Sequence, residues 1–338
     1  MIKQTLVAAL AVMSAAALVS AASLDPNNPT GTRGLILIDK LGSHVRFADP
    51  SSYKELASLE LETAPHDLVI SPDHRAVYIP IYGDGVYGRN PHPGHLIAIV
   101  DLNSRQLTGT IDVSPYQAPH GIQIDQKGML YVTCDLSRKL LVIDPKKRSV
   151  EAAIDTEGTG HWVAVLPDGS KAYVANKNDK PFVTVIDLKT RKLIGRIPAP
   201  DGTQGIAASP DGKWVVAADN GKPSLIVIQP ADDTVALNLP LEGNPKGAFK
   251  PRFTPDGSKL LVCNLNGTVN IINVADPHGK QTVVNVGKDP MGFAISPDGK
   301  TALVANHGDG TVSVIDLTEA RLASSFKAGT GIETLSYY

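Results

Sequence analysis

The 338-residue chain carries 32 basic and 34 acidic residues, a formal net charge of −2, and 42% of its residues are hydrophobic. This balance is typical of a globular protein and gives no electrostatic case for nucleic-acid binding. Its 30 Gly and 25 Pro residues favour a fold that is rich in turns.

The first residues have the pattern of a secretory signal peptide. Lys3 gives a positively charged start, residues 6–19 form an apolar, Ala-rich run, and small residues follow at 20–23. The run is too short for a good membrane span, although an uncleaved anchor is the alternative. We therefore expect a signal peptide over 1–22, a leader strap over 23–33, and a periplasmic or secreted mature protein with no membrane anchor after cleavage.

Three short strands are predicted after the leader, over residues 34–39, 44–49 and 55–61, with no inner partner of their own. An isolated strand is predicted at the C-terminus, over residues 333–338. Joining the two ends of the chain would complete one four-stranded sheet. It would also remove exposed sheet edges that invite aggregation.

Between these ends the chain repeats one pattern of four short strands. In the clearest copy, strands are predicted over 293–295, 302–305, 312–316 and 322–326, and a Ser-Pro-Asp-Gly-Lys turn at 296–300 follows the first. In that turn Pro sets φ, Asp caps locally and Gly takes a positive φ. Related turns occur near residues 72, 127, 167, 210 and 255.

A four-stranded repeat with a period of about 40–45 residues is typical of a β-propeller. Inner strands are expected near residues 68, 122, 163, 206, 251, 293 and 335. The chain is therefore predicted to be all-β: a seven-bladed β-propeller with four antiparallel strands per blade. We expect one domain over 34–338, with its first blade closed by N- and C-terminal strands.

The second strands of several repeats share a sequence pattern. Tyr131-Val132-Thr133, Tyr173-Val174-Ala175-Asn176 and Leu303-Val304-Ala305-Asn306 each follow a Pro-Asp-Gly-like turn and precede Val-Ile-Asp. This pattern resembles the YVTN family of β-propeller repeats over nearly the whole mature chain. The resemblance implies the fold but no single function, because that family includes adhesion, surface-layer, scaffold and enzyme members. Cys134 departs from the motif, since it stands where the motif has Asn.

The only two cysteines, Cys134 and Cys263, fall on second strands of blades far apart on the ring. A disulfide needs Cα atoms within about 7 Å. We therefore expect two free thiols that behave as small buried hydrophobes.

Equivalent positions in the repeats define one ring of side chains. Each position lies six residues before the Pro of a turn, or its counterpart, where an inner strand enters the central channel. Equivalent positions should lie at one height and surround one mouth of the channel. They are His66, His120, His161, Gln204, Phe249 and Met291, with Glu333 added from the C-terminal strand. A shift in the register of that strand would place Thr330 there instead of Glu333.

Three histidines and a carboxylate from four consecutive blades are a ligand set that a divalent metal ion such as zinc prefers. We expect His66, His120, His161 and Glu333 to bind this ion, with Asp67 as an outer partner. In the alternative, each histidine only bonds a carbonyl group of the neighbouring blade.

One repeat carries a long insertion between its second and third strands, over residues 82–94. Long loops often carry function. We expect His92 and His95 from this insertion, with His307 of the last blade, to position substrate or shuttle protons, and Glu333 to be a ligand or general base. Arg89 is a candidate clamp for a substrate carboxylate, and Gln204, Phe249 and Met291 are candidates for the wall of the site. The alternative is a solvated loop and a filled channel.

No familiar catalytic motif occurs: the chain lacks G-x-S-x-G, the phosphate-binding P-loop, H-E-x-x-H, C-x-x-C and a haem-attachment motif. Similar propellers include lactonases and lyases that act at the channel mouth. The sequence therefore favours an exported, metal-dependent enzyme of the hydrolase or lyase type that acts on a small organic substrate. The alternative is a non-catalytic binding or scaffold propeller that presents its rim loops to a ligand or a protein partner.

Overall fold

The computed structural model describes residues 33–87, 89–177, 181–243 and 247–338. The predicted signal peptide (1–22) and all but Arg33 of the predicted leader (23–33) lie outside the described residues. Within the described ranges, no helix has the length and apolarity needed to span a membrane.

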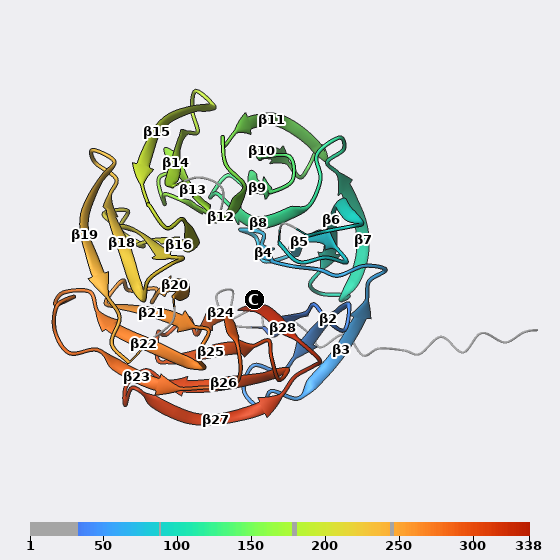
Figure 1. Cartoon of the computed structure of the whole chain (residues 1–338). Coiled ribbons are helices and arrows are strands. Elements are labelled where there is room, and N and C mark those ends of the chain that lie inside the picture. The colour runs from blue at the N-terminus through green and yellow to red at the C-terminus, as the bar shows by residue number, and fades with distance from the viewer. Residues whose placement is uncertain (1–32, 88, 178–180, 244–246) are drawn as a thin grey trace, which may run out of the picture. The chain divides into compact units, whose positions relative to one another are not determined.

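Seven four-stranded antiparallel sheets form a ring around a central channel (Figure 1), so the predicted seven-bladed, all-β architecture is confirmed. From the channel outward, blade 1 comprises β28 (Ile332–Tyr337), β1 (Leu35–Asp39), β2 (His44–Ala48) and β3 (Glu55–Glu60). Blade 2 comprises β4 (Val69–Ile70), β5 (Ala76–Gly83), β6 (Pro93–Asp101) and β7 (Gln106–Asp112). Blade 3 comprises β8 (Pro119–Ile124), β9 (Leu130–Cys134), β10 (Lys139–Asp144) and β11 (Ser149–Asp155). Blade 4 comprises β12 (Gly160–Val165), β13 (Lys171–Asn176), β14 (Phe182–Asp187) and β15 (Lys192–Pro198). Blade 5 comprises β16 (Thr203–Ala208), β17 (Val215–Asp219), β18 (Ser224–Gln229) and β19 (Thr234–Pro240). Blade 6 comprises β20 (Ala248–Phe253), β21 (Lys259–Asn264), β22 (Thr268–Asn273) and β23 (Thr282–Asn285). Blade 7 comprises β24 (Pro290–Ile295), β25 (Thr301–Asn306), β26 (Thr311–Asp316) and β27 (Arg321–Lys327).

The hydrophobic core lies between neighbouring blades. One apolar cluster combines Tyr131 and Leu140 of blade 3 with Val163 and Val174 of blade 4, all of them buried. A single blade has no partner for such a face, so the blades stabilise one another. Cys134 and Cys263 are free and buried in two separate clusters, as expected.

Asparagine side chains explain why the second strands end as they do. Asn176, Asn264 and Asn306 are fully buried and end β13, β21 and β25. Asn306 Nδ2 donates to Thr311 Oγ1 at 3.0 Å and to Ser313 Oγ at 2.9 Å, which ties the second strand of the blade to the third. These bonds satisfy the Nδ2 group of Asn306, which would be costly to bury unpaired, whereas its buried Oδ1 has no partner among the described residues.

Strands from both ends of the chain close blade 1, as predicted. β28 pairs with β1 with Leu335 opposite Leu37. The buried Asp39 carboxylate accepts hydrogen bonds from the backbone N–H groups of Thr330 (3.1 Å) and Gly331 (2.9 Å), and from Arg46 Nε (2.9 Å). Burial disfavours the charged carboxylate, but these donors outweigh that effect and lower the pKa of Asp39.

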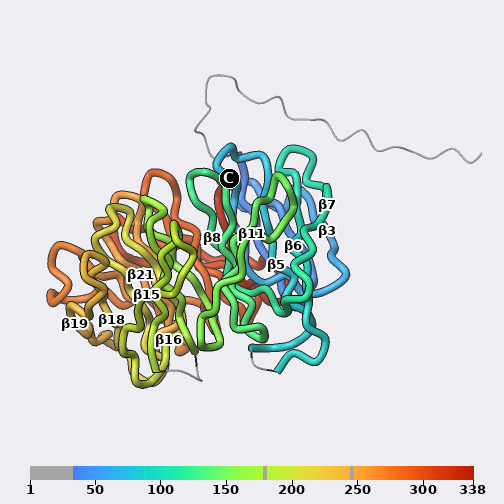
Figure 2. Tube along the Cα trace, turned by 90° about the horizontal axis from the view of Figure 1, so that it is seen from above, coloured from blue at the N-terminus to red at the C-terminus, as the bar shows by residue number. Residues whose placement is uncertain are grey.

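The long insertion in blade 2 forms a hairpin rather than a 13-residue loop over 82–94. β5 continues to Gly83 and β6 begins at Pro93, and these two residues pair. The connection is therefore shorter than the sequence indicated, because backbone pairing extends into it. Figure 2 shows this hairpin, in teal, at the lower face of the ring, and the C-terminal residue at the opposite face.

Asp39→Ala should weaken the closure of the ring. The change leaves three backbone donors, of Gly42, Thr330 and Gly331, without their acceptor, and Arg46 keeps only Glu55. Hydrogen bonds to a charged group contribute about 1.5–3 kcal/mol each. We expect the free energy of unfolding, measured in urea, to fall by about 3 kcal/mol or more. Asp49→Ala, which removes a turn cap in the same blade, is the control. An equal loss in the two variants would contradict a special role for Asp39.

Candidate functional site

The seven predicted ring positions lie at one end of the channel, here called the histidine end. Six of them are the second residue of an inner strand, and His66 lies three residues before the short β4 of blade 2, next to the isolated bridge of Pro65 with Ile81. Met291 is half-buried, whereas the other six are buried. The structure places Glu333 in the ring, while Thr330 precedes β28 and bonds Asp39 through its backbone.

Close approach of neighbouring inner strands brings ring side chains together. Gly121 follows His120, and a Cβ at this glycine would lie 2.8 Å from His161 O and 3.0 Å from Trp162 Cα. Only glycine permits such an approach of two backbones. Gly205 and Gly292 occupy the corresponding positions in blades 5 and 7.

The three histidines form a stack. The ring centroids of His66 and His120 are 3.8 Å apart, those of His120 and His161 are 4.2 Å apart, and the rings tilt by 43° and 35°. One imidazole nitrogen, His120 Nδ1, lies 3.0 Å from the carbonyl oxygen of His161. For His120, this contact matches the alternative in which a histidine only bonds a carbonyl group of the neighbouring blade.

Aromatic side chains that the sequence analysis did not single out surround the stack. Trp162 packs edge-on against His161 with centroids 4.0 Å apart, and Tyr87 does so at 4.5 Å. Tyr82 lies 5.3 Å from His66 and 5.2 Å from His120. One signal was available, since Trp162 directly follows a ring position and the two tyrosines belong to the long insertion.

The stack is electrically neutral near pH 7. Burial lowers the pKa of all three histidines well below 6.5, and nearby positive groups, including Lys40, lower them further. Neutral imidazoles keep a lone pair for a metal ion or a proton.

Glu333 links the stack to the last blade. Its Oε1 lies 3.5 Å from His66 Nε2, and its Oε2 lies 3.1 Å from His307 Nδ1, within ion-pair distance but without the alignment of a hydrogen bond. Burial raises the pKa of this carboxyl, but Lys40 and His307 outweigh that effect, and the net shift is downward. Glu333 is therefore ionised near pH 7 and can accept a proton.

Polar groups without a hydrogen-bond partner concentrate at this end of the channel. Among the described residues, eleven buried side-chain polar atoms have no such partner, and six of them belong to the ring or its immediate neighbours. They are His66 Nδ1, His161 Nδ1, Trp162 Nε1, Gln204 Oε1, His307 Nδ1 and Glu333 Oε2. His161 Nδ1 lies near the backbone of Gln204 but is not aligned to bond it. Two of the six, Glu333 Oε2 and His307 Nδ1, face each other at 3.1 Å. Buried polar groups are normally paired, so the remaining four indicate where a guest could bind.

The types of side chain at this end suit a divalent metal ion, but their arrangement does not. In the described part of the chain, no three His, Cys, Asp or Glu side chains are arranged to hold a metal ion. Three imidazoles bound tetrahedrally at about 2.0–2.1 Å would place neighbouring ring centroids roughly 5 Å apart. The stacked rings are closer than this, so His66, His120 and His161 would have to separate to share one ion.

The remaining predicted residues lie on the rim. His92 and Arg89 are exposed in the hairpin loop, and His92 Nδ1 pairs with Asp84 at 2.6 Å. His95 is exposed on β6. The described contacts of these three side chains do not reach the ring, so their roles toward a substrate stay predictions. Phe249 packs edge-on against Trp162 at 5.4 Å.

Two lysines and an aspartate with a raised pKa lie beside the two tyrosines. Lys40 Nζ lies 5.6 Å from the Tyr82 ring centroid and Lys177 Nζ 4.8 Å from that of Tyr87. Tyr82 donates a 2.8 Å hydrogen bond to the buried carboxylate of Asp135, and burial raises the pKa of Asp135 to about 6. This end of the channel therefore carries positive groups on Lys40 and Lys177 together with the carboxyl groups of Asp135 and Glu333.

Comparison with known proteins supports the fold. No family model matches the chain. Over 193 residues the chain is 21% identical to antigen Lp49 of Leptospira interrogans, a match that covers 53% of this chain and 41% of the antigen's length. A solved structure of Kuenenia stuttgartiensis hydrazine synthase matches with a TM-score of 0.67 and 22% identity, over 80% of this chain and 89% of that one. At this identity the likeness establishes a β-propeller fold.

Acid should destabilise the protein through the histidine stack. A histidine whose pKa is lowered in the folded state binds fewer protons there than in the unfolded state. The free energy of unfolding is therefore fully retained above about pH 6.5 and declines as the pH falls below that value. Each pH unit below this value costs about 1.4 kcal/mol per such histidine.

Measured in urea from pH 7.5 to 5.5, the stability of wild type should therefore fall by about 1.4 kcal/mol more than that of His120→Gln. His278→Gln, on an exposed turn, is the control and should follow wild type. Parallel curves for wild type and His120→Gln would contradict the neutral, buried state of His120.

Proposed function

We propose that the protein is an exported, metal-dependent enzyme of the hydrolase or lyase type, acting on a small organic substrate at the histidine end of the channel. One observation carries the proposal. Neutral imidazoles from three consecutive blades meet an ionised Glu333 where buried polar atoms without partners concentrate. The similar hydrazine synthase structure adds only that this fold occurs in an enzyme.

Under the proposal, His66, His120, His161 and Glu333 hold a divalent ion such as zinc after the stacked rings separate. Such an ion, when bound, polarises a substrate oxygen or lowers the pKa of a water molecule. Glu333 Oε2 and His307 Nδ1 are close enough to pass a proton between them at the edge of the site.

The other residues bind and orient the substrate. Gln204, Phe249 and Met291 form the side of the ring opposite the histidines and present one amide and two apolar surfaces. Arg89 on the rim is suited to a substrate carboxylate, and His92 and His95 provide further proton carriers there. The lysines over Tyr82 and Tyr87 favour an anionic substrate.

A non-catalytic binding or scaffold propeller is the second candidate. The close stacking of the three rings favours it, because stacked imidazoles fill the channel mouth without converging on a point. In that case the exposed hairpin loop with Arg89 and His92 would contact a ligand or a protein partner.

Metal analysis of the purified mature protein distinguishes the two functions. We expect about one tightly bound divalent ion per chain, lost in His120→Ala and retained in the control His278→Ala. Hydrolysis of lactones and esters, screened with and without a chelator, should depend on that ion. A metal-free wild type, together with unchanged stability after His66, His120 and His161 are all replaced by Ala, would favour the scaffold.

A further inference from the structure

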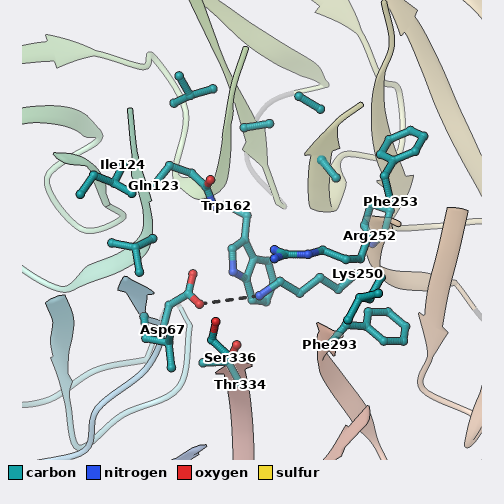
Figure 3. Close-up of a pocket in the computed structure, with 18 of the residues that line it drawn as sticks. Asp67, Gln123, Ile124, Trp162, Lys250, Arg252, Phe253, Phe293, Thr334 and Ser336 are labelled. Atoms are coloured by element: carbon teal, nitrogen blue, oxygen red, sulfur yellow. Dashed lines mark ion pairs between the residues drawn. The ribbon is translucent and has the colours of Figure 1, made fainter. Parts of the chain in front are cut away.

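A septum divides the channel below the histidine end. It consists of Asp67, Trp162 and Lys250, each of which directly follows a ring position in the sequence. Lys250 Nζ lies 3.8 Å from Asp67 Oδ1 across the channel and 4.8 Å from the centroid of the Trp162 ring (Figure 3). The side chains of Asp67 and Lys250 are only 8% and 16% exposed. This septum separates the histidine stack from the rest of the channel.

Beyond the septum lies a cavity of about 510 Å³. The last residue of every inner strand lines it, so it occupies the channel at the end where the Pro-Asp-Gly turns lie, here called the turn end. These seven residues are Ile70, Ile124, Val165, Ala208, Phe253, Ile295 and Tyr337. A volume of this size is typical of small-molecule sites, which occupy roughly 300–1,000 Å³.

Arg252 gives this cavity an unbalanced positive charge. Its side chain extends toward Trp162 in Figure 3, and it is exposed to the cavity. Across the described residues, it has no hydrogen-bond or ion-pair partner, whereas Lys250 is paired with Asp67. Asp67, Lys250 and Arg252 are the Asp, Glu, Lys and Arg side chains among the lining residues, so the guanidinium is the charge left without an opposite partner. Enclosure lowers the pKa of Arg252 and Asp67 opposes that shift, but a guanidinium remains protonated.

Apolar surface surrounds the guanidinium. The half-buried Ile70, Ile124, Val165 and Ile295 line its wall, while Gln123 and Ser336 add polar groups. Phe253 and Phe293 also border the cavity, but their rings are buried in the core between blades (Figure 3). An anionic head that pairs with a guanidinium fork, attached to an apolar body, would satisfy both features.

We propose that the turn-end cavity binds a small organic carboxylate, with Arg252 holding the carboxylate and the half-buried isoleucine and valine side chains of the wall contacting its apolar body. A carboxylate matches the planar fork of arginine through two parallel hydrogen bonds. This site is separate from the histidine end and does not depend on the function proposed there.

The proposal can be tested by isothermal titration calorimetry of the full mature protein with benzoate and with its neutral analogue benzamide. Benzoate should bind, and benzamide should bind at least tenfold more weakly because it cannot pair with Arg252. Equal affinities for the two compounds, or no benzoate binding up to tens of millimolar, would overturn the proposal.

Variants identify the residue and the end of the channel. Arg252→Gln should weaken benzoate binding at least tenfold and should fold normally, because Arg252 has no described partner to lose. Arg321→Gln, on the exposed outer strand β27, is the matched control and should bind as wild type does. His120→Ala should also leave benzoate binding unchanged, which separates this site from the histidine end. Unaltered affinity in Arg252→Gln, or its loss in Arg321→Gln, would refute the assignment.

Discussion

The pairing of β28 with β1 is the constraint on which the rest of the structure depends. Seven sheets enclose a channel only when the last inner strand takes its place beside the first blade, and Asp39 fixes that joint through two backbone N–H groups and Arg46. The same joint brings Glu333, near the end of the chain, within 3.5 Å of His66. Closure of the fold and assembly of the histidine end are therefore one event.

Burial determines the chemistry at the histidine end. Desolvation keeps three imidazoles neutral, while Lys40 and His307 keep the equally buried Glu333 ionised. A carboxylate beside neutral histidines can receive a proton or a cation, whereas protonated histidines would repel a cation. The proposed metal site requires these rings to separate, because their centroids are closer than a shared ion would set them.

Sequence periodicity predicts those features that depend on backbone register. The turns and β-branched runs gave the strands, and the repeat placed seven ring positions at one height, including Glu333. Side-chain orientation depends on neighbours that the repeat does not encode, so the stacking of His66 on His120 was not predictable. Trp162 and Arg252 were overlooked for a different reason. They lie one and three positions after ring residues, on the face that simple alternation sets opposite those residues. A β-bulge near the start of each of these inner strands breaks the alternation, and the repeat pattern does not reveal it.

The septum has a consequence for the central channel of the propeller. Asp67 and Lys250 are largely buried where they pair, and a charge left unpaired in such a place is costly. This ion pair and Trp162 therefore mark a stable boundary between the histidine end and the turn-end cavity. The two proposed guests would bind on opposite sides of that boundary.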